Sequence, residues 1–298
     1  MSSSKSTKAV IFALSGNVVI TIMKFIAAFF TRSASMSAEA IHSSADCLNQ
    51  VFLLVGNKRT QKDNDEQHPF GYGREEFFWG FIVAILLFFG GAAYSIFEGV
   101  IKLSNPEPVQ HVMWALIVLG ISMLIEGKTF LIAYRTMKQS YKGSIFKAIK
   151  KSVDINLIVI LLEDAAALVG LIFAFICTLL ATVYPMFDGI GSLLVGFTLC
   201  YVSYSLVNEL RQLIIGESMP RDDRARIKEI VAEFDVVTHV NRIKTMTMGR
   251  NNYLLLLSVN ADDFIRVFKV EDAVEEMKKD IMFEFPQVTE IFIEISEQ

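Results

Sequence analysis

Two side chains that can bind a metal ion, His42 and Asp46, stand four residues apart in a stretch that continues as an apolar run. On a helix this spacing places both side chains on one face, about one turn apart. An imidazole and a carboxylate on one face can share a divalent cation. A polar pair that fixes helix packing would have the same spacing. Because burying both groups at membrane depth is costly unless they are paired or metallated, the spacing favours a metal site.

A second pair of polar groups, Glu163 and Asp164, interrupts another apolar run. Two adjacent carboxylates in an apolar helix are hard to explain by packing. A proton on one of them, or a shared cation, would neutralise the pair. A further carboxylate, Glu39, precedes His42 by one turn. We expect it either near the mouth of a cavity or as an interfacial charge at the start of the helix.

The elements that must position these groups are membrane spans. The chain has 298 residues, is 53% hydrophobic and has a mean hydropathy of +0.44, which is too apolar for a soluble domain. Apolar stretches of roughly the ~20 residues that a bilayer requires occur six times. The expected spans are residues 8–30, 35–57, 76–102, 111–135, 153–182 and 187–210.

The distribution of Lys and Arg predicts the orientation of these spans. Basic residues crowd into the N-terminus, the loop after the second span and the segment after the fourth span, up to Lys150 and Lys151. The opposite loops offer only Arg32 and Lys102. The positive-inside rule therefore places both termini in the cytoplasm. The N-terminus shows no Arg-rich amphipathic targeting segment, so we expect an integral protein of the bacterial inner membrane.

Several function classes are excluded by composition and motifs. The net charge of -4 argues against a nucleic-acid partner. Cys47, Cys177 and Cys200 lie in apolar runs without a CxxC motif, so we interpret them as small buried hydrophobic residues. No Walker, nucleophile-elbow or zinc-protease motif is present, so ATP-driven pumping and hydrolysis have no support and we expect no enzyme.

The last part of the chain has the composition of a soluble α+β domain. Helical periodicity predicts helices at residues 222–234 and 271–285, and alternating patterns predict strands at 240–248, 253–259 and 288–295. The order αββαβ indicates a small helix-on-sheet sandwich. We therefore expect a six-helix transmembrane domain over residues 1–216 and a cytoplasmic domain over residues 217–298.

Four motifs together resemble the cation diffusion facilitator family. They are residues 13–17 (ALSGN) with Lys24, residues 37–46 (SAEAIHSSAD), residues 68–76 (HPFGYGREE) and residues 188–196 (DGIGSLLVG). The resemblance implies a homodimeric antiporter that exports zinc or a related divalent cation in exchange for protons. It also implies six transmembrane helices and a ferredoxin-like cytoplasmic domain. The Glu-Asp pair is similar to a divergent branch that includes the animal mitochondrial zinc transporter.

The resemblance also implies a ligand set for the transported ion. His42 and Asp46 match the ligands of the second span, and Asp164 matches the Asp of the fifth span. The remaining ligand position carries Ile160, which cannot bind metal. Glu163 is the nearest substitute, although it is rotated by about 100° from Asp164 on a helix. We predict a metal site of His42, Asp46, Asp164 and Glu163, in which zinc is favoured and manganese or iron(II) is possible.

Secondary sites of the family are incomplete in this sequence. Asp65 and His68 match loop ligands, but Tyr72 replaces a second His, so a solvated acidic loop is the simpler interpretation. Arg74 and Glu217 stand where the family has a charge contact between the spans and the soluble domain; two unrelated interfacial charges are the alternative.

The soluble domain has Asn241, Leu256 and Glu294 at family metal positions and keeps only His239. We expect it to dimerise without a strong regulatory metal site.

The leading functional hypothesis is a homodimeric, proton-coupled exporter of divalent cations that works by alternating access. A manganese or iron(II) exporter of the same type is one alternative. A transport-defective relative that acts as a structural or regulatory membrane partner is another, motivated by Ile160. A metal-linked membrane enzyme would need a nucleophile or an activated water, and the sequence offers neither constellation.

Overall fold

The computed structural model describes residues 2–60, 62–140, 155–249, 252–262 and 264–296. The chain divides into two compact units. The first comprises residues 1–53 and 80–208, and the second comprises residues 54–79 and 209–298. The segment 54–79, which joins the second and third expected spans, therefore groups by its contacts with the C-terminal part of the chain.

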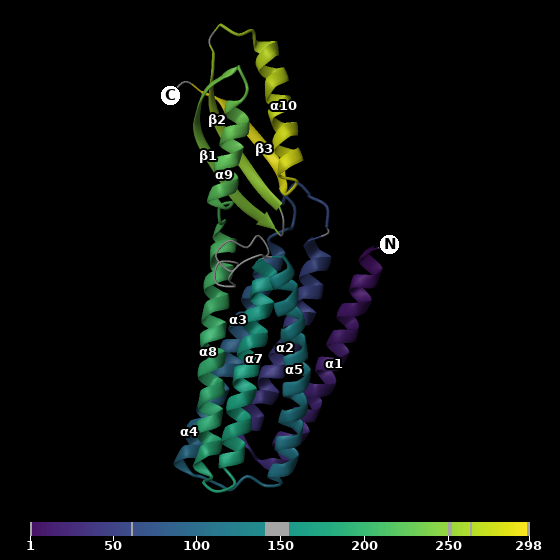
Figure 1. Ribbon diagram of the computed structural model, residues 1–298, viewed down its shortest axis with the longest axis vertical. Helices are drawn as coiled ribbons and strands as arrows, with labels where there is room; N and C mark the ends of the chain where they lie inside the picture. The colour runs from purple at the N-terminus through teal and green to yellow at the C-terminus, as the bar shows by residue number, and fades with distance from the viewer. Residues whose placement is uncertain (1, 61, 141–154, 250–251, 263, 297–298) are drawn as a thin grey trace. The chain divides into compact units, whose positions relative to one another are not determined.

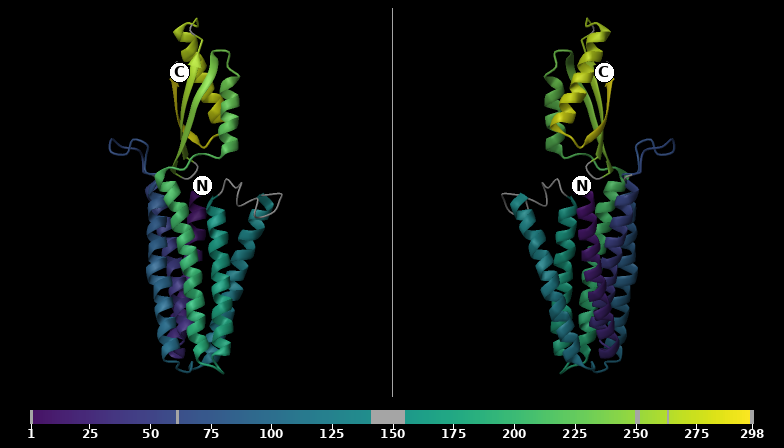
Figure 2. Two further views of the ribbon diagram at one scale, coloured as in Figure 1. Left: turned by 90° about the vertical axis from the view of Figure 1, so that its left-hand side faces the viewer. Right: turned by 90° about the vertical axis from the view of Figure 1, so that its right-hand side faces the viewer.

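Long helices occupy all six expected spans. Within the first unit they run side by side, as both Figure 1 and Figure 2 show. The third expected span is continuous but changes from α to π geometry over residues 87–93 and back again. The described helices are α1 (Ser2–Thr31), α2 (Ala34–Thr60), α3 (Glu75–Leu86) with η1 (Leu87–Ala93) and α4 (Tyr94–Ser104), α5 (Val112–Ser140), α7 (Ile155–Leu180) and α8 (Met186–Ile215). Residues 153–154 of the fifth expected span, and the basic residues of segment 141–154, lie outside the described residues.

In the described part of the chain, four helical segments are long and apolar enough to cross a membrane: Leu14–Thr31, Glu75–Ser104, Val112–Ile132 and Met186–Ile215. The side chains of α7 are described from Asp164 onward, and this part forms the apolar segment Asp164–Leu180. α2 has a lower hydropathy because its first half is rich in Ser and carries the His42–Asp46 pair. Among the described helices of the first unit, α2 is therefore the least apolar, and it carries two of the candidate metal ligands.

The start of α2 is tied to the start of α8 by the fully buried carboxylate of Asp188. Its Oδ2 accepts the N–H of Ala34 at 2.7 Å, and its Oδ1 accepts the N–H of Ser35 at 3.1 Å and the hydroxyl of Ser33 at 2.6 Å. These backbone donors have no partner inside α2, so a charged acceptor from α8 caps the helix. Lys102 of α4 lies 3.9 Å from the same carboxylate.

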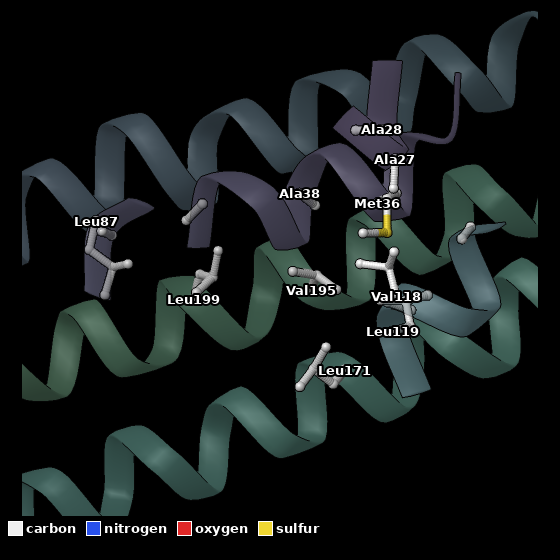
Figure 3. Packing of buried hydrophobic residues seen from close by; sticks show 14 residues of the cluster. Ala27, Ala28, Met36, Ala38, Leu87, Val118, Leu119, Leu171, Val195 and Leu199 are labelled. Carbon is white, nitrogen blue, oxygen red and sulfur yellow. The ribbon is translucent and has the colours of Figure 1, made fainter. Parts of the chain in front are cut away.

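Small residues allow α4 and α8 to approach closely. A Cβ on Gly99 would lie 2.9 Å from the carbonyl oxygen of Gly189, and a Cβ on Gly196 would lie 2.8 Å from the side chain of Ile96. Beside this contact, Leu87, Leu119, Leu171, Val195 and Leu199 contribute to the buried apolar core of the unit (Figure 3). The same core includes Met36 of α2 and Leu171 of α7, so it packs the two helices that carry the candidate metal ligands.

The C-terminal unit contains the expected αββαβ arrangement. The order is α9 (Arg221–Ala232), β1 (Val237–Gly249), β2 (Asn252–Ala261), α10 (Val267–Glu284) and β3 (Val288–Ile295). β2 lies between β1, to which it pairs antiparallel, and β3, to which it pairs parallel. The two helices pack on the sheet through a core that includes Ile227, Val231, Leu255, Met277 and Ile281. The predicted helix-on-sheet sandwich is confirmed.

Candidate metal centre

The His42–Asp46 pair lies on one face of α2, as its spacing predicts. His42 Nε2 is 3.8 Å from Asp46 Oδ2. Two ligands of a tetrahedral zinc ion, each about 2.1 Å from the metal, are about 3.4 Å apart, so the pair is close to the separation that one ion requires. The His42 side chain is 6% exposed and the Asp46 side chain is 39% exposed, so the ion would be approached from the Asp46 side.

His42 is a buried polar group without the partners that burial normally demands. Neither of its ring nitrogens has a hydrogen-bond partner among the described residues. A cavity of about 10 Å³ adjoins the ring and is lined by residues of α2, α3, η1 and α8, including Asp46, Asn49 and Val202. That volume is at the lower limit for a single water molecule or ion. An imidazole with two open nitrogens beside such a cavity is suited to bind a cation.

Asp164 and Glu163 belong to α7, whose side chains are described from Asp164 onward. The half-buried carboxylate of Asp164 is near enough to that of Asp46 for the two charges to repel each other. The structure therefore brings the α2 pair and the α7 carboxylate into one region. Within the residues described, no three His, Cys, Asp or Glu side chains are close enough together to hold a metal ion.

Glu39 was expected either near the mouth of a cavity or as an interfacial charge at the start of the helix. Both expectations are wrong, because Glu39 is fully buried and ion-paired. Its Oε2 is 3.1 Å from the ammonium of Lys24 on α1, which also donates to Ser43 at 2.7 Å and to Glu126 of α5 at 3.2 Å. The side chains of Lys24 and Glu39 are both 0% exposed. The sequence shows these charges only as isolated residues in separate apolar runs. Isolated charges in several spans are the signal that could have suggested mutual pairing.

The weaker candidate site, in the loop of Asp65 and His68, has its carboxylate oxygens hydrogen-bonded to other residues of the same loop. Asp65 Oδ2 accepts from the Tyr72 hydroxyl at 2.5 Å and from Lys62 at 3.2 Å, while Oδ1 accepts the N–H of His68 at 2.8 Å. The hydroxyl of Tyr72, first among these partners, holds the pKa of Asp65 well below its usual range. The Asp65 oxygens are thus occupied by protein donors, which favours the solvated-loop interpretation over a metal site.

Arg74 and Glu217 share a partner in β1. Arg74 donates to the carbonyl of Thr247 at 3.4 Å, and Thr247 donates its N–H and its hydroxyl to the backbone carbonyl of Glu217. The described residues include no Arg74–Glu217 ion pair. Burial, and then the nearby charge of Glu209, raise the pKa of the Glu217 carboxyl. A paired Arg would lower that pKa, so its direction agrees with the absence of this ion pair from the described residues.

In the soluble domain, the two family metal positions nearest the start of β1 show no metal-binding arrangement among the described residues. His239 is exposed on β1, and Asn241 donates to the carbonyl of Ser296 at 2.9 Å. The three cysteines are free; Cys177 is buried and the other two are half-buried.

Comparison with known proteins identifies the family to which the chain belongs. A family model described as the cation efflux transmembrane domain matches residues 10–215, and one described as the cation efflux protein cytoplasmic domain matches residues 219–298. The chain belongs to the cation efflux family. The predicted resemblance to cation diffusion facilitators is confirmed, and the chain is an integral membrane protein with a C-terminal cytoplasmic domain. The names of the family and its members point to transporters rather than enzymes.

Similar members of the cation efflux family carry three kinds of name. The proton-coupled zinc antiporter SLC30A9, mitochondrial, of Xenopus laevis is 33% identical over 86% of this chain and 46% of its own length. Metal tolerance protein C4 of Arabidopsis thaliana is 32% identical over 83% of this chain and 55% of its own length. Manganese efflux system protein MneP of Bacillus subtilis is 25% identical over 98% of this chain and 96% of its own length. The chain spans about half the length of the first relatives that it matches.

Proposed function

We propose that the chain is a divalent-cation efflux transporter that exchanges metal for protons by alternating access. The observation that carries the proposal is the face of α2 on which His42 and Asp46 lie 3.8 Å apart. The imidazole there has no hydrogen-bond partner among the residues that the structure describes. A buried polar group without a partner is costly, so its retention favours a ligand that binds there. The names of similar family members, which include a zinc antiporter and a manganese efflux system protein, support the proposal of efflux.

The proposed ligand set is His42, Asp46, Asp164 and Glu163. Asp164 already lies near enough to Asp46 for their charges to interact. Mutual repulsion between these carboxylates would be relieved by a cation between them. Glu163 follows Ile160 by three residues, about one helical turn, and would complete a four-coordinate site in its place.

Proton coupling follows from the chemistry of these ligands. Imidazole and carboxylate groups must lose protons before they bind a divalent cation, so metal release and proton uptake occur at the same atoms. An inward proton gradient would then favour release of the metal on the far side of the membrane.

Zinc is our first choice of ion, with manganese as the second candidate and iron(II) as a third. An imidazole with two or three carboxylates suits tetrahedral zinc. The same set has more oxygen than nitrogen ligands, which favours manganese more than a two-His site would. The printed names of similar proteins include a zinc antiporter and a manganese efflux protein.

For the assembly, we propose a homodimer formed through the domain of residues 217–298, with the transmembrane domain comprising residues 1–216. The match to the cytoplasmic domain of the family supports this division. The loop of Asp65 and His68 and the contact between Arg74 and the strand next to Glu217 would lie on the cytoplasmic side. We propose the bacterial inner membrane as the location, and we place both termini in the cytoplasm because of the distribution of basic residues.

The test is ion-selective uptake into proteoliposomes that carry a pH gradient, with wild type beside Asp46→Ala and Glu163→Gln. Loss of uptake in both variants would make Glu163 a ligand, whereas loss in Asp46→Ala alone would leave a three-residue site. Asp65→Asn is the matched control, since that carboxylate is held by protein donors. If well-folded wild type moved neither zinc, manganese, iron(II) nor cobalt, the transport proposal would be replaced by the partner-protein alternative.

A further inference from the structure

A buried lysine lies beside the candidate metal centre without belonging to it. Lys24 of α1 is fully buried, and its ammonium group has oxygen partners on two other helices. The distances are 2.7 Å to Ser43, 3.1 Å to Glu39 and 3.2 Å to Glu126. An ammonium group has three donors, and here all three are used.

This arrangement has the form of an occupied cation site. One positive charge is surrounded by two carboxylates and a hydroxyl that come from α2 and α5. The second carboxylate oxygens, Glu39 Oε1 and Glu126 Oε2, are buried and have no hydrogen-bond partner among the described residues. Two buried carboxylates with open oxygens would attract a metal ion if the ammonium were absent.

Glu39 is also placed to compete for the transported ion. It precedes His42 by three residues on the same helix, so the two side chains are neighbours on the surface of α2. Its open oxygen faces α7, where a Cβ on Gly170 would lie 3.0 Å from Oε1. Among the described residues, the ion pair with Lys24 is what holds the other oxygen toward α1.

We propose that Lys24 is a specificity-determining residue of the transporter. Its ammonium fills a cation position between α2 and α5 and so withholds both glutamates from the transported ion. The inference rests on the proposed function, because it concerns which ion the face of His42 and Asp46 accepts. With the glutamates withheld, the site keeps a mixed nitrogen and oxygen character; with them released, it would gain hard oxygen ligands that favour manganese.

The experiment compares wild type with Lys24→Ala as full-length chains in detergent. Bound Zn²⁺ and bound Mn²⁺ are measured separately by equilibrium dialysis and elemental analysis. We expect Lys24→Ala to bind one more Mn²⁺ per chain than wild type and its Mn²⁺ affinity relative to Zn²⁺ to rise by about tenfold or more. The double variant Lys24→Ala with Glu39→Gln should return to the wild-type number, because one of the two released carboxylates has been removed.

Lys102→Ala is the matched control. Lys102 is another buried lysine of the same unit, but it donates to the backbone carbonyl of Arg32 at 2.9 Å, and the Asp188 carboxylate near it already has three donors. Its removal should add no Mn²⁺. An unchanged Mn²⁺ number in Lys24→Ala, or an equal gain in Lys102→Ala, would overturn the inference.

A second variant keeps the inference testable if Lys24→Ala does not fold. Glu39→Gln keeps the size of the side chain and an oxygen acceptor for Lys24. We expect its Zn²⁺ affinity to stay within about threefold of wild type, because Glu39 is not a ligand; a loss of about a hundredfold would make it one and refute the inference. Absence of Zn²⁺ binding and transport in wild type would instead refute the proposed function, while the gain of Mn²⁺ in Lys24→Ala would still be measurable.

Discussion

The carboxylate of Asp188 should be one of the most stabilising single groups of the helical unit. It is fully buried and accepts the backbone N–H groups of Ala34 and Ser35 and the hydroxyl of Ser33. The change Asp188→Ala leaves both backbone donors without an acceptor. Hydrogen bonds to charged groups contribute about 1.5–3 kcal/mol each, so the two backbone bonds predict a loss of about 3–6 kcal/mol.

The assay follows unfolding of the helical unit in mixed detergent micelles through the fluorescence of Trp114 on α5. The second tryptophan, Trp79, is replaced by Phe in every variant so that the signal reports one unit. The control is Glu107→Ala, which removes an exposed carboxylate from the loop between α4 and α5 of the same unit and should change the free energy by less than about 0.5 kcal/mol.

The change Asp188→Ala should also affect the metal centre. The first turn of α2 sets the position of His42, which follows Ala34 by eight residues. We therefore expect Asp188→Ala to weaken Zn²⁺ binding as well as stability. A loss of stability below about 1 kcal/mol would refute the capping argument, since a buried donor without an acceptor costs at least that much.

Three further predictions concern packing and charge. Gly73→Ala places a Cβ 2.5 Å from a backbone oxygen of β1, so the loop before α3 should detach and trypsin should cleave it about threefold faster or more. Gly189→Ala places a Cβ 2.9 Å from a backbone oxygen of α4 and should cost about 1–3 kcal/mol in the Trp114 assay. Burial, and then the charge of Glu209, raise the pKa of Glu217 in the folded state. Ionisation of this carboxyl at higher pH therefore lowers the free energy of unfolding. Glu217→Gln should therefore raise the melting temperature of the C-terminal unit at pH 7, and the gain should vanish below pH 4.5, the ordinary glutamate value, where the carboxyl is protonated in both states.

Local patterns predicted most of the C-terminal unit. β3 runs over Val288–Ile295, the predicted range, because alternation of apolar and polar residues is visible within the segment itself. β1 begins at Val237, three residues before the predicted start, because it continues to pair with the end of β2 at Ala261. Pairing between strands extends an element beyond the residues whose own pattern would define it.

Pairings between distant residues were less predictable. The resemblance implied a charge contact between Arg74 and Glu217, and two unrelated interfacial charges were the alternative. The described contacts instead connect both residues to Thr247, so a strand backbone takes the place of an ion pair. Sequence positions indicated that the two segments are neighbours, but not which atoms would meet.

The sequence by itself determined the helical spans and the shared face of His42 and Asp46, because both depend on periodicity within one segment. Only the tertiary structure decided the partners of Glu39. Lys24 is 15 residues away from it, and Glu126 is 102 residues away from Lys24. Such contacts depend on how each helix is rotated about its axis when the bundle packs. That rotation is set by the steric fit of whole helix surfaces, which no local sequence pattern records.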